Sequence, residues 1–303
     1  MTPLRRFGSE RGQAIVLVVI SLVAMLGMAA AVLDVGSWYR ADRKLQTTMD
    51  AAALAAAQAL PTDTGTAEAL AGEYASKNGG GLDAVSFSTT ASANDTVTVT
   101  GSQPTPGFFS RIFGIDSVTV NATATARVGA LSTARGVAPI GVDVLHPELQ
   151  CDPAPCSNNP TVLDLDKVGP GAFRLINVDG SHGGTAPHTL ADWIVNGSQI
   201  DMERDQYYGD PGAKFNSSHF KDALDAVIGR ELLFPVYDDI RGSGANAEYH
   251  IIGWVGFVIT GYNIHGSHTN QIEGYFTEVI WDGDMGTTPP PDDFGARTIS
   301  LIK

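Results

Sequence analysis

The chain has 303 residues, with 33 acidic and 19 basic side chains and a formal net charge of −14 at neutral pH. Residues 1–33 contain three arginines and one glutamate, a net charge of +2, so the rest of the chain carries −16. Such an acidic surface argues against nucleic acid or an anionic membrane face as its partner. It favours a soluble, self-repelling exterior.

Residues 14–33 form an uncharged apolar run, AIVLVVISLVAMLGMAAAVL, in which Ser21 is the one polar side chain. At about 1.5 Å per residue, a helix of this length spans about 30 Å, the hydrocarbon thickness of a bilayer. Only a helix satisfies its own backbone in lipid, so we expect a transmembrane helix here. A signal peptide cleaved near Ala29–Ala31 is the alternative, but its hydrophobic region would be shorter than this run.

Charge and cysteine content predict the orientation of this anchor. Three arginines precede the run, whereas the basic residues after it are diluted by acids, which favours a cytoplasmic N-terminus at residues 1–13. Cys151 and Cys156 bracket the stretch CDPAPC and predict a local disulfide in an oxidising compartment. In the cytosol the same pair would form half of a zinc site with His146, but a fourth ligand is missing. We therefore expect a single-pass cell-membrane protein with its bulk extracytoplasmic.

Residues 34–60 predict a stalk helix that continues the span without a proline. Trp38 and Tyr39 follow the span, where aromatic rings anchor at the membrane interface. A seam of apolar residues then recurs at helical spacing; its members are Leu45, Met49, Ala52, Ala56 and Ala59. This seam either packs on the chain's own next domain or docks helices of partner membrane proteins.

The stretch from Arg11 to Leu60 resembles the N-terminal segment of the TadE/TadG-like Flp (tight adherence) pilus-assembly family. The matching features are Arg11-Gly12-Gln13, the apolar helix, Asp34, Gly36, Trp38-Tyr39, Arg43-Lys44, Leu45-Gln46 and the run Asp50 to Ala57. The resemblance covers about residues 10–60 and implies an accessory protein of an Flp pilus or a related secretion machine. Its partners would be the lipid bilayer and other pilus-assembly membrane proteins. Longer members carry an Asp-x-Ser-x-Ser metal site, which this sequence lacks, so metal-dependent adhesion is not implied.

The rest of the chain predicts an α+β architecture in two units. In residues 61–130, a helix ends at Gly79–Gly81, and a hairpin turns at residues 92–95. A short helix in FFSRIF and a long alternating strand at 118–126 follow, so we expect three antiparallel strands with helices on one side. Residues 131–303 predict a β-rich distal domain, a sandwich or barrel, with helices at 188–195 and 217–228. Its strands are expected at 162–168, 173–178, 232–237, 249–262 and 272–281.

Motifs of catalysis are lacking in the sequence. It contains no nucleophile elbow, phosphate-binding loop or dinucleotide fingerprint. His265 and His268 lie in a glycine-rich turn, and paired aspartates such as Asp164 and Asp166 are typical of solvated turns, with calcium as the alternative. We therefore expect no enzyme, cofactor, small-molecule substrate or nucleic-acid partner, and a membrane-anchored scaffold. The competing hypothesis is an envelope enzyme or a ligand-binding or adhesin protein that acts through residues 131–303.

Overall fold

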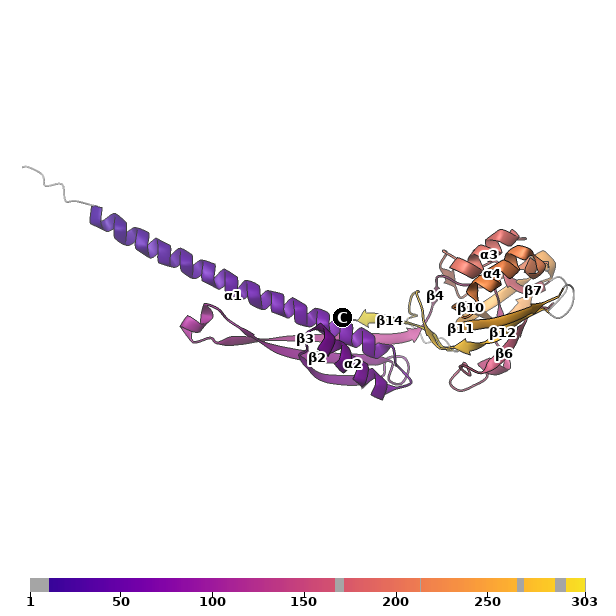
Figure 1. The fold of residues 1–303 in the computed structure, drawn as a ribbon, viewed down its shortest axis with the longest axis horizontal. Coiled ribbons are helices and arrows are strands. Elements are labelled where there is room, and N and C mark those ends of the chain that lie inside the picture. The colour runs from indigo at the N-terminus through magenta and orange to yellow at the C-terminus, as the bar shows by residue number, and fades with distance from the viewer. Residues whose placement is uncertain (1–10, 167–171, 213, 266–269, 287–292, 303) are drawn as a thin grey trace, which may run out of the picture.

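The computed structural model describes residues 11–166, 172–212, 214–265, 270–286 and 293–302, and for residues 11–13, 172 and 173 the backbone alone. The predicted N-terminal tail (residues 1–10), the end of the strand expected at 162–168 and His268 lie outside the described residues. Figure 1 shows a long helix, a small sheet beside its C-terminal half, and a distal domain beyond that sheet.

The chain is a mixed helix and sheet protein, as predicted. The elements follow in the order α1 (Arg11–Ala57), α2 (Thr64–Asn78), β1 (Leu82–Ser88), β2 (Thr96–Pro106), η1 (Ser110–Phe113), β3 (Ser117–Ala130), β4 (Thr133–Ala134), β5 (Val142–Asp143), η2 (Pro147–Leu149), β6 (Pro160–Asp164), β7 (Ala172–Ile176), α3 (Pro187–Asn196), β8 (Met202–Glu203), β9 (Gln206–Pro211), η3 (Lys214–Asn216), α4 (Ser218–Val227), β10 (Glu231–Arg241), η4 (Gly244–Asn246), β11 (Glu248–Ile264), β12 (Asn270–Thr277), β13 (Val279–Ile280) and β14 (Ala296–Ile302).

Helix α1 combines the predicted span and the predicted stalk in one continuous element of 47 residues. Its apolar N-terminal part is long enough to cross a membrane, and none of its most hydrophobic window is buried within the protein. The span therefore presents its side chains outward on all sides, as a lipid-embedded helix does. Beyond residue 44, α1 buries one face against a sheet.

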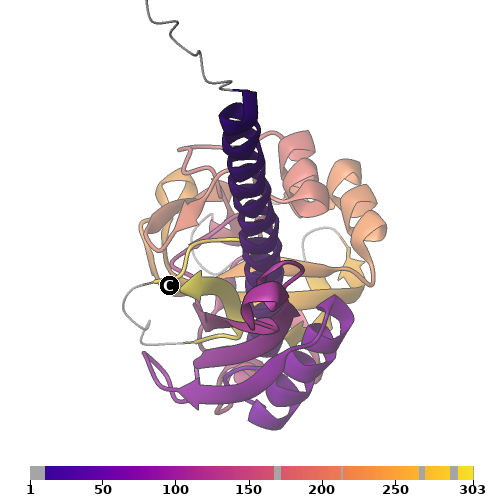
Figure 2. The same cartoon turned by 90° about the vertical axis from the view of Figure 1, so that its left-hand side faces the viewer.

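That sheet, which we call the proximal sheet, has the strand order β1-β2-β3-β14-β13. β1 and β2 form the predicted hairpin, and Asp95 fixes its turn by accepting the backbone N–H groups of Thr90, Ala91 and Ser92 at 2.7–3.0 Å. Alternate side chains of β3 point into one core together with α1 and α2. Figure 2 shows α1 lying across this sheet with α2 beside it. We call the sheet with α2 and the C-terminal half of α1 the proximal domain.

One long strand from the range predicted as the distal domain, residues 131–303, pairs within the proximal sheet. β14 leaves the distal domain and pairs antiparallel with β3, from Arg297 opposite Ala130 to Ile302 opposite Thr125. Without β14 this edge of β3 would present unpaired backbone groups along its length. Local periodicity does not contain this information, because the two partners lie more than a hundred residues apart in the sequence.

The distal domain is built on the long strand β11. β10 pairs with β11 along most of its length, while β9 and then β12 occupy its other side. β7 pairs with β9, and hydrogen bonds from Gly141 N–H to Arg174 C=O (2.9 Å) and from Ile176 N–H to Pro139 C=O (3.0 Å) join β7 to the segment leading into β5. Since β5 pairs with β10, the strands close into a barrel-like ring, and β12 and β6 extend it. α3 and α4 cover its outside (Figure 1).

Candidate functional site: a membrane-proximal clamp

The surface of α1 changes character at Asp34, one residue after the apolar span. The preceding large hydrophobic side chains are exposed, whereas Asp34 is only 3% exposed. A carboxylate is costly to bury unless hydrogen-bond donors compensate it. Asp34 has three such donors: it accepts the backbone N–H groups of Phe108 at 2.8 Å, Phe109 at 3.0 Å and Ser110 at 2.6 Å.

These donors belong to the loop of residues 107–116, which joins β2 to β3. Asp34 lies at the N-terminus of η1, where backbone N–H groups lack partners within the helix, so a carboxylate on α1 caps a helix distant in the sequence. Burial raises the pKa of Asp34, but the N–H groups of Phe108, Ser110 and Phe109 outweigh it and lower the pKa below its ordinary value. The carboxylate therefore stays ionised and holds the loop on α1.

The loop is closed by its own hydrogen bonds and by a close approach to Trp38. Gly107 N–H donates to Asp116 C=O at 3.1 Å, and Ser110 Oγ donates to Ile115 C=O at 2.9 Å. A Cβ at Gly107 would lie 1.8 Å from Ser110 Oγ and 3.4 Å from the Trp38 ring, so a side chain there would displace the Ser110 hydroxyl from its position. We call Asp34, Trp38 and residues 107–116 the membrane-proximal clamp.

The predicted interface pair lies at this clamp, but its two rings face different surroundings. Trp38 is half-buried under the loop, whereas Tyr39 is exposed and its hydroxyl accepts a hydrogen bond from Arg43 Nε at 3.1 Å. The guanidinium of Arg43 also lies 5.2 Å from the centre of the Tyr39 ring. Tyr39 and Arg43 are therefore available to the surroundings of α1, while Trp38 is part of the domain.

The predicted helix-docking face is occupied by the chain's own sheet. Leu45, Met49, Ala52 and Ala56 are buried in one core with β2, β3 and α2, and Ala59 is half-buried at its edge. In the structure the seam makes the intramolecular contact, which is the first of the two alternatives. Helical spacing predicts an apolar contact but does not identify the surface that makes it. The exposed side of α1 instead carries Tyr39, Arg43, Thr47 and Leu54.

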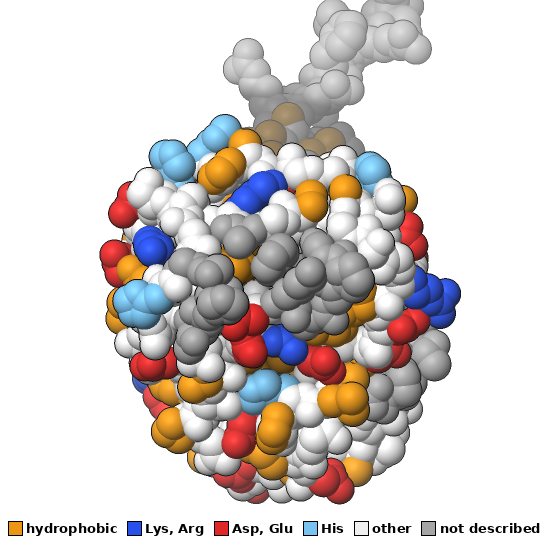
Figure 3. All heavy atoms as spheres, turned by 90° about the vertical axis from the view of Figure 1, so that its right-hand side faces the viewer, with side chains coloured by type: hydrophobic (Ala, Val, Ile, Leu, Met, Phe, Trp, Pro, Cys, Tyr) orange, Lys and Arg blue, Asp and Glu red, His pale blue; other side chains and the backbone are white. Residues whose placement is uncertain are grey.

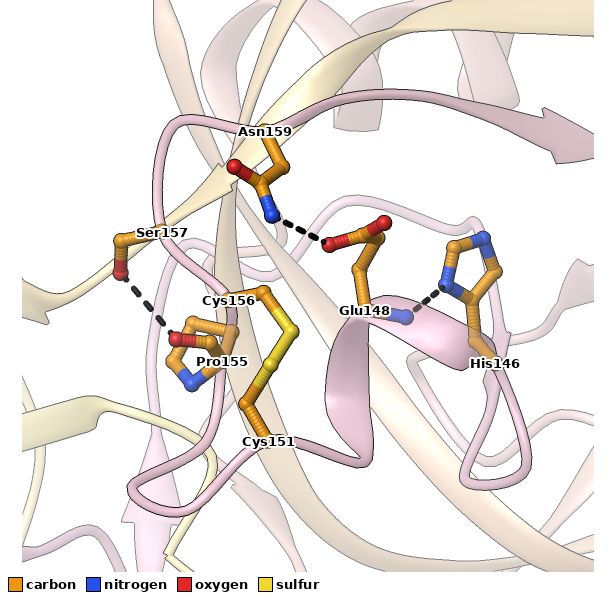
Figure 4. Close-up of a disulfide and its surroundings, with 7 residues drawn as sticks. All are labelled: His146, Glu148, Cys151, Pro155, Cys156, Ser157 and Asn159. Atoms are coloured by element: carbon orange, nitrogen blue, oxygen red, sulfur yellow. Dashed lines mark hydrogen bonds between the residues drawn. A yellow bond between two sulfur atoms is a disulfide. The ribbon is translucent and has the colours of Figure 1, made fainter.

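The two cysteines form a disulfide with a Cα–Cα distance of 5.4 Å. Figure 4 shows that His146 is directed away from the sulfur atoms, on the other side of η2. Its Nδ1 accepts the N–H of Glu148 at 3.2 Å and so caps η2. Asn159 donates to the Glu148 carboxylate at 3.0 Å, which ties the disulfide loop to this turn. The cysteines and His146 thus serve local structure, and the zinc alternative does not arise in this arrangement.

A cavity of about 610 Å³ lies beside this turn in the distal domain. Burial lowers the pKa of the His146 ring at its rim. Arg174 Nε donates to the Tyr237 hydroxyl at 3.1 Å, and Asp143 accepts the N–H of Leu145 at 2.9 Å. The charged groups of the cavity therefore have structural partners, and the hydroxyl of Thr161, which also lines the cavity, lies 3.5 Å from His146 Nε2.

The paired aspartates also have protein partners. Asp164 accepts the N–H of Asp166 at 2.8 Å, and Asp238 contacts His250 at 2.7 Å. Among the described residues, no group of three or more His, Cys, Asp or Glu side chains is arranged to hold a metal ion. On the face shown in Figure 3, acidic, basic and hydrophobic side chains of the described residues are interspersed.

Sequence reasoning missed the loop that completes the clamp. The lone acid at the end of the span and the pair Phe108-Phe109 after two prolines were the available signals, but nothing local connects them. Arg297 was also missed: it is buried on β14 and pairs with Glu278 at 2.7 Å and Asp293 at 2.8 Å.

A family model described as Flp pilus-assembly TadE/G-like (Tad) matches residues 12–59. Comparisons with curated proteins and with solved structures found no match. The matched segment coincides with α1 and includes Asp34, Trp38 and the buried seam, whereas the loop, the disulfide and the distal cavity lie outside it. The resemblance predicted from the sequence is thus confirmed for the N-terminal segment, where residues 12–59 match the TadE/G-like Flp pilus-assembly model.

Proposed function

We propose that this protein is a single-pass accessory or scaffold protein of an Flp (tight adherence) pilus-assembly system or a related secretion machine. Its N-terminus is cytoplasmic and its folded bulk extracytoplasmic. Its role is positional rather than catalytic: it holds the proximal and distal domains at a fixed place above the membrane. The family match over residues 12–59 supports the assignment to pilus assembly.

The observation that carries this proposal is the continuity of α1. The same helix provides the apolar span and, about two and three turns after Trp38, the side chains of Leu45 and Met49 in the proximal core. No linker separates the anchor from the folded domain. A rigid helical connection fixes the height and orientation of the folded domain above the membrane. A flexible linker would leave both undetermined, which an enzyme that only needs to stay near the membrane can tolerate.

Two features support this orientation: the arginines before the span and the disulfide after it. Arginines precede the apolar run, in agreement with the positive-inside rule. The disulfide between Cys151 and Cys156 is stable in an oxidising compartment and rare in the cytosol. Cysteine labelling of the intact cell envelope tests this directly: Leu145→Cys should react with a membrane-impermeant maleimide, and cytosolic protection of that residue would contradict the orientation.

The partner experiment must preserve the fold. Deleting residues 34–60 would remove Leu45 and Met49 from the proximal core, so loss of partners after that deletion would report unfolding. Reversing charge or polarity on the exposed side of α1, with Arg43→Glu and Leu54→Asp, leaves the core intact. We expect the intact tagged protein to retain pilus-assembly membrane proteins from a mild detergent extract of its native host, and the double variant to lose some of them. Absence of such proteins from the intact sample would refute the scaffold role.

Ligand binding in the distal domain is a second candidate function. The cavity has the size of a small-molecule site, and Asp143, His146 and Arg174 converge on it. A screen of anionic and cationic metabolites by thermal shift, with Arg174→Gln as the comparison, tests this function. Stabilisation of the intact protein that the variant loses would favour it over a purely positional role.

A further inference from the structure

The loop of the membrane-proximal clamp exposes an unusual amount of apolar surface. Phe108, Ile112 and Phe113 are 71%, 79% and 80% exposed, and Phe109 and Ile115 are also exposed. Among the described residues outside α1, no other stretch of eight residues exposes more than two large hydrophobic side chains. Scattered apolar side chains are normal on a soluble surface, whereas a cluster marks a contact with another apolar phase.

The position of the loop of residues 107–116 indicates that its apolar side chains contact lipid. Beyond Gly101 the hairpin of β2 and β3 has lost its pairing with β1, and its end lies beside α1 and points toward the N-terminus of the helix (Figure 1). Asp34 binds the loop backbone immediately after the last residue of the span, Leu33. If the span occupies the hydrocarbon core, the loop lies at the level of the membrane interface, where aromatic and large aliphatic side chains partition favourably.

We propose that the tip of the β2–β3 hairpin inserts Phe108, Ile112 and Phe113 into the interface of the leaflet into which α1 emerges, as a second membrane contact. The occupant of this apolar surface is the lipid of the same bilayer. The exposed Arg111 lies between these side chains, where its guanidinium reaches lipid phosphate groups. This inference rests on the membrane anchoring proposed above.

A second membrane contact explains what the membrane-proximal clamp contributes to the orientation of the protein. A single helix leaves a domain free to tilt relative to the membrane. A second contact beside the helix restricts this tilt, provided that the loop is fixed relative to the helix. The three hydrogen bonds to Asp34 and the contact of Gly107 with Trp38 supply that fixation. The hydrogen bonds between the Asp34 carboxylate and the loop backbone therefore hold the hydrophobic tip at the membrane surface, and the loop covers these bonds from water.

The test places an environment-sensitive fluorophore (a nitrobenzoxadiazole) at one introduced cysteine of the full chain. Under non-reducing conditions the native cysteines are joined to each other and do not react. The protein is reconstituted in phosphatidylcholine vesicles, with and without phosphatidylglycerol, that contain lipids spin-labelled near the headgroup or deep in the acyl chain. The labelled positions are Ile112→Cys in the tip, Val19→Cys in the span and, as a control of similar exposure to Ile112, Leu145→Cys in the distal domain.

We expect the label at Ile112 to show blue-shifted emission and quenching by the shallow spin label, and the label at Leu145 to show neither. Replacing Phe108 and Phe113 by serine, which alters exposed side chains only, should abolish this quenching at Ile112 while deep quenching at Val19 persists. Quenching at Val19 without quenching at Ile112 would overturn the inference and leave the anchor intact. A blue shift at Ile112 without lipid quenching would also overturn it, because a protein surface would then cover the tip. Lack of quenching at both positions would refute the anchoring itself.

Discussion

Truncation of Met49 tests how the anchor helix is joined to the folded domain. The side chain is fully buried, and a Cβ at Gly101 would come within 2.5 Å of its sulfur, so no space surrounds it. Met49→Ala removes Cγ, Sδ and Cε, which at about 0.8 kcal/mol per buried methylene equivalent amounts to about 2.4 kcal/mol. The cavity left behind adds to this, so we expect the free energy of unfolding of the proximal domain to fall by about 2.5–4 kcal/mol.

The assay is thermal unfolding of the intact chain in detergent, combined with hydrogen exchange of peptides from β2 and β3. For a domain of about 100 residues, this loss corresponds to a decrease of about 10 °C or more in Tm. The control is Leu54→Ala, on the exposed side of the same helix, where the side chain is 36% exposed. We expect that variant to change the free energy of unfolding by about 1 kcal/mol or less.

The comparison separates the two interpretations of the apolar seam. If Met49→Ala were no more destabilising than Leu54→Ala, the packing of α1 on the sheet could not be a core contact. If Met49→Ala also abolished binding of partner proteins without changing exchange in β2 and β3, the seam would dock other helices, and our reasoning on the proximal core would be refuted.

Three further predictions concern buried charges. Asp34→Asn should speed hydrogen exchange at residues 108–110, because a neutral side chain binds three N–H groups less well. In the native protein the pKa of Asp34 is lowered, so its contribution to the free energy of unfolding should be complete above the ordinary carboxyl pKa and should fade as the pH falls below it. Arg297→Met should weaken the pairing of β14 and lower the free energy of unfolding by about 1.5–3 kcal/mol, whereas Arg241→Met, at an exposed ion pair, should have no measurable effect. Lys214→Met should cost about 3–5 kcal/mol at neutral pH, because it leaves the fully buried Asp210 carboxylate without its cation.

The last of these predictions carries a pH signature. Burial raises the pKa of Asp210 in spite of Lys214, so the folded state binds a proton more readily than the unfolded state. Stability from this group therefore falls as the pH rises from the ordinary carboxyl pKa through the raised value. Denaturation of Lys214→Met as a function of pH should show the penalty shrinking in acid. A penalty for Lys214→Met that does not vary with pH would contradict the role given to Asp210. Unchanged hydrogen exchange in β14 for Arg297→Met, or at residues 108–110 for Asp34→Asn, would contradict the predictions for those two variants.

The elements predicted from the sequence are those whose signals are local. Ser217 caps α4 through its hydroxyl, and the acidic turn at Asp95 joins β1 to β2. The run from Tyr249 to Tyr262 was predicted as a strand, and it forms most of the central strand β11. In these cases the capping residue, the turn or the length of the run decides the structure by itself.

The parts that sequence reasoning missed depend on pairing between distant segments. β9 is short, contains glycine and proline, and is a strand because β11 and β7 flank it. β14 follows a proline-rich stretch and gives no sign that its partner is β3. In the candidate site, Asp34 was noted for its place in a family pattern, but its partners lie 74 to 76 residues further along the chain. A lone buried carboxylate requires hydrogen-bond donors, but the sequence does not indicate which loop supplies them.

The two domains are joined in a way that extends the rigidity of the anchor. β3 carries the chain out of the proximal sheet at Ala130, and β14 brings it back to the neighbouring position at Arg297. Because both connections are paired strands and Arg297 binds Glu278 and Asp293 across the junction, a hinge there would have to bend two strands and separate the buried Arg297 from its carboxylate partners. At about 100° of rotation per helical residue, the register between Leu33 and Leu45 then sets the direction in which the proximal sheet faces, and with it the distal domain. The spacing of the matched segment therefore sets this direction, and we predict that inserting or deleting one residue there would turn the folded domains by about 100° about the helix axis.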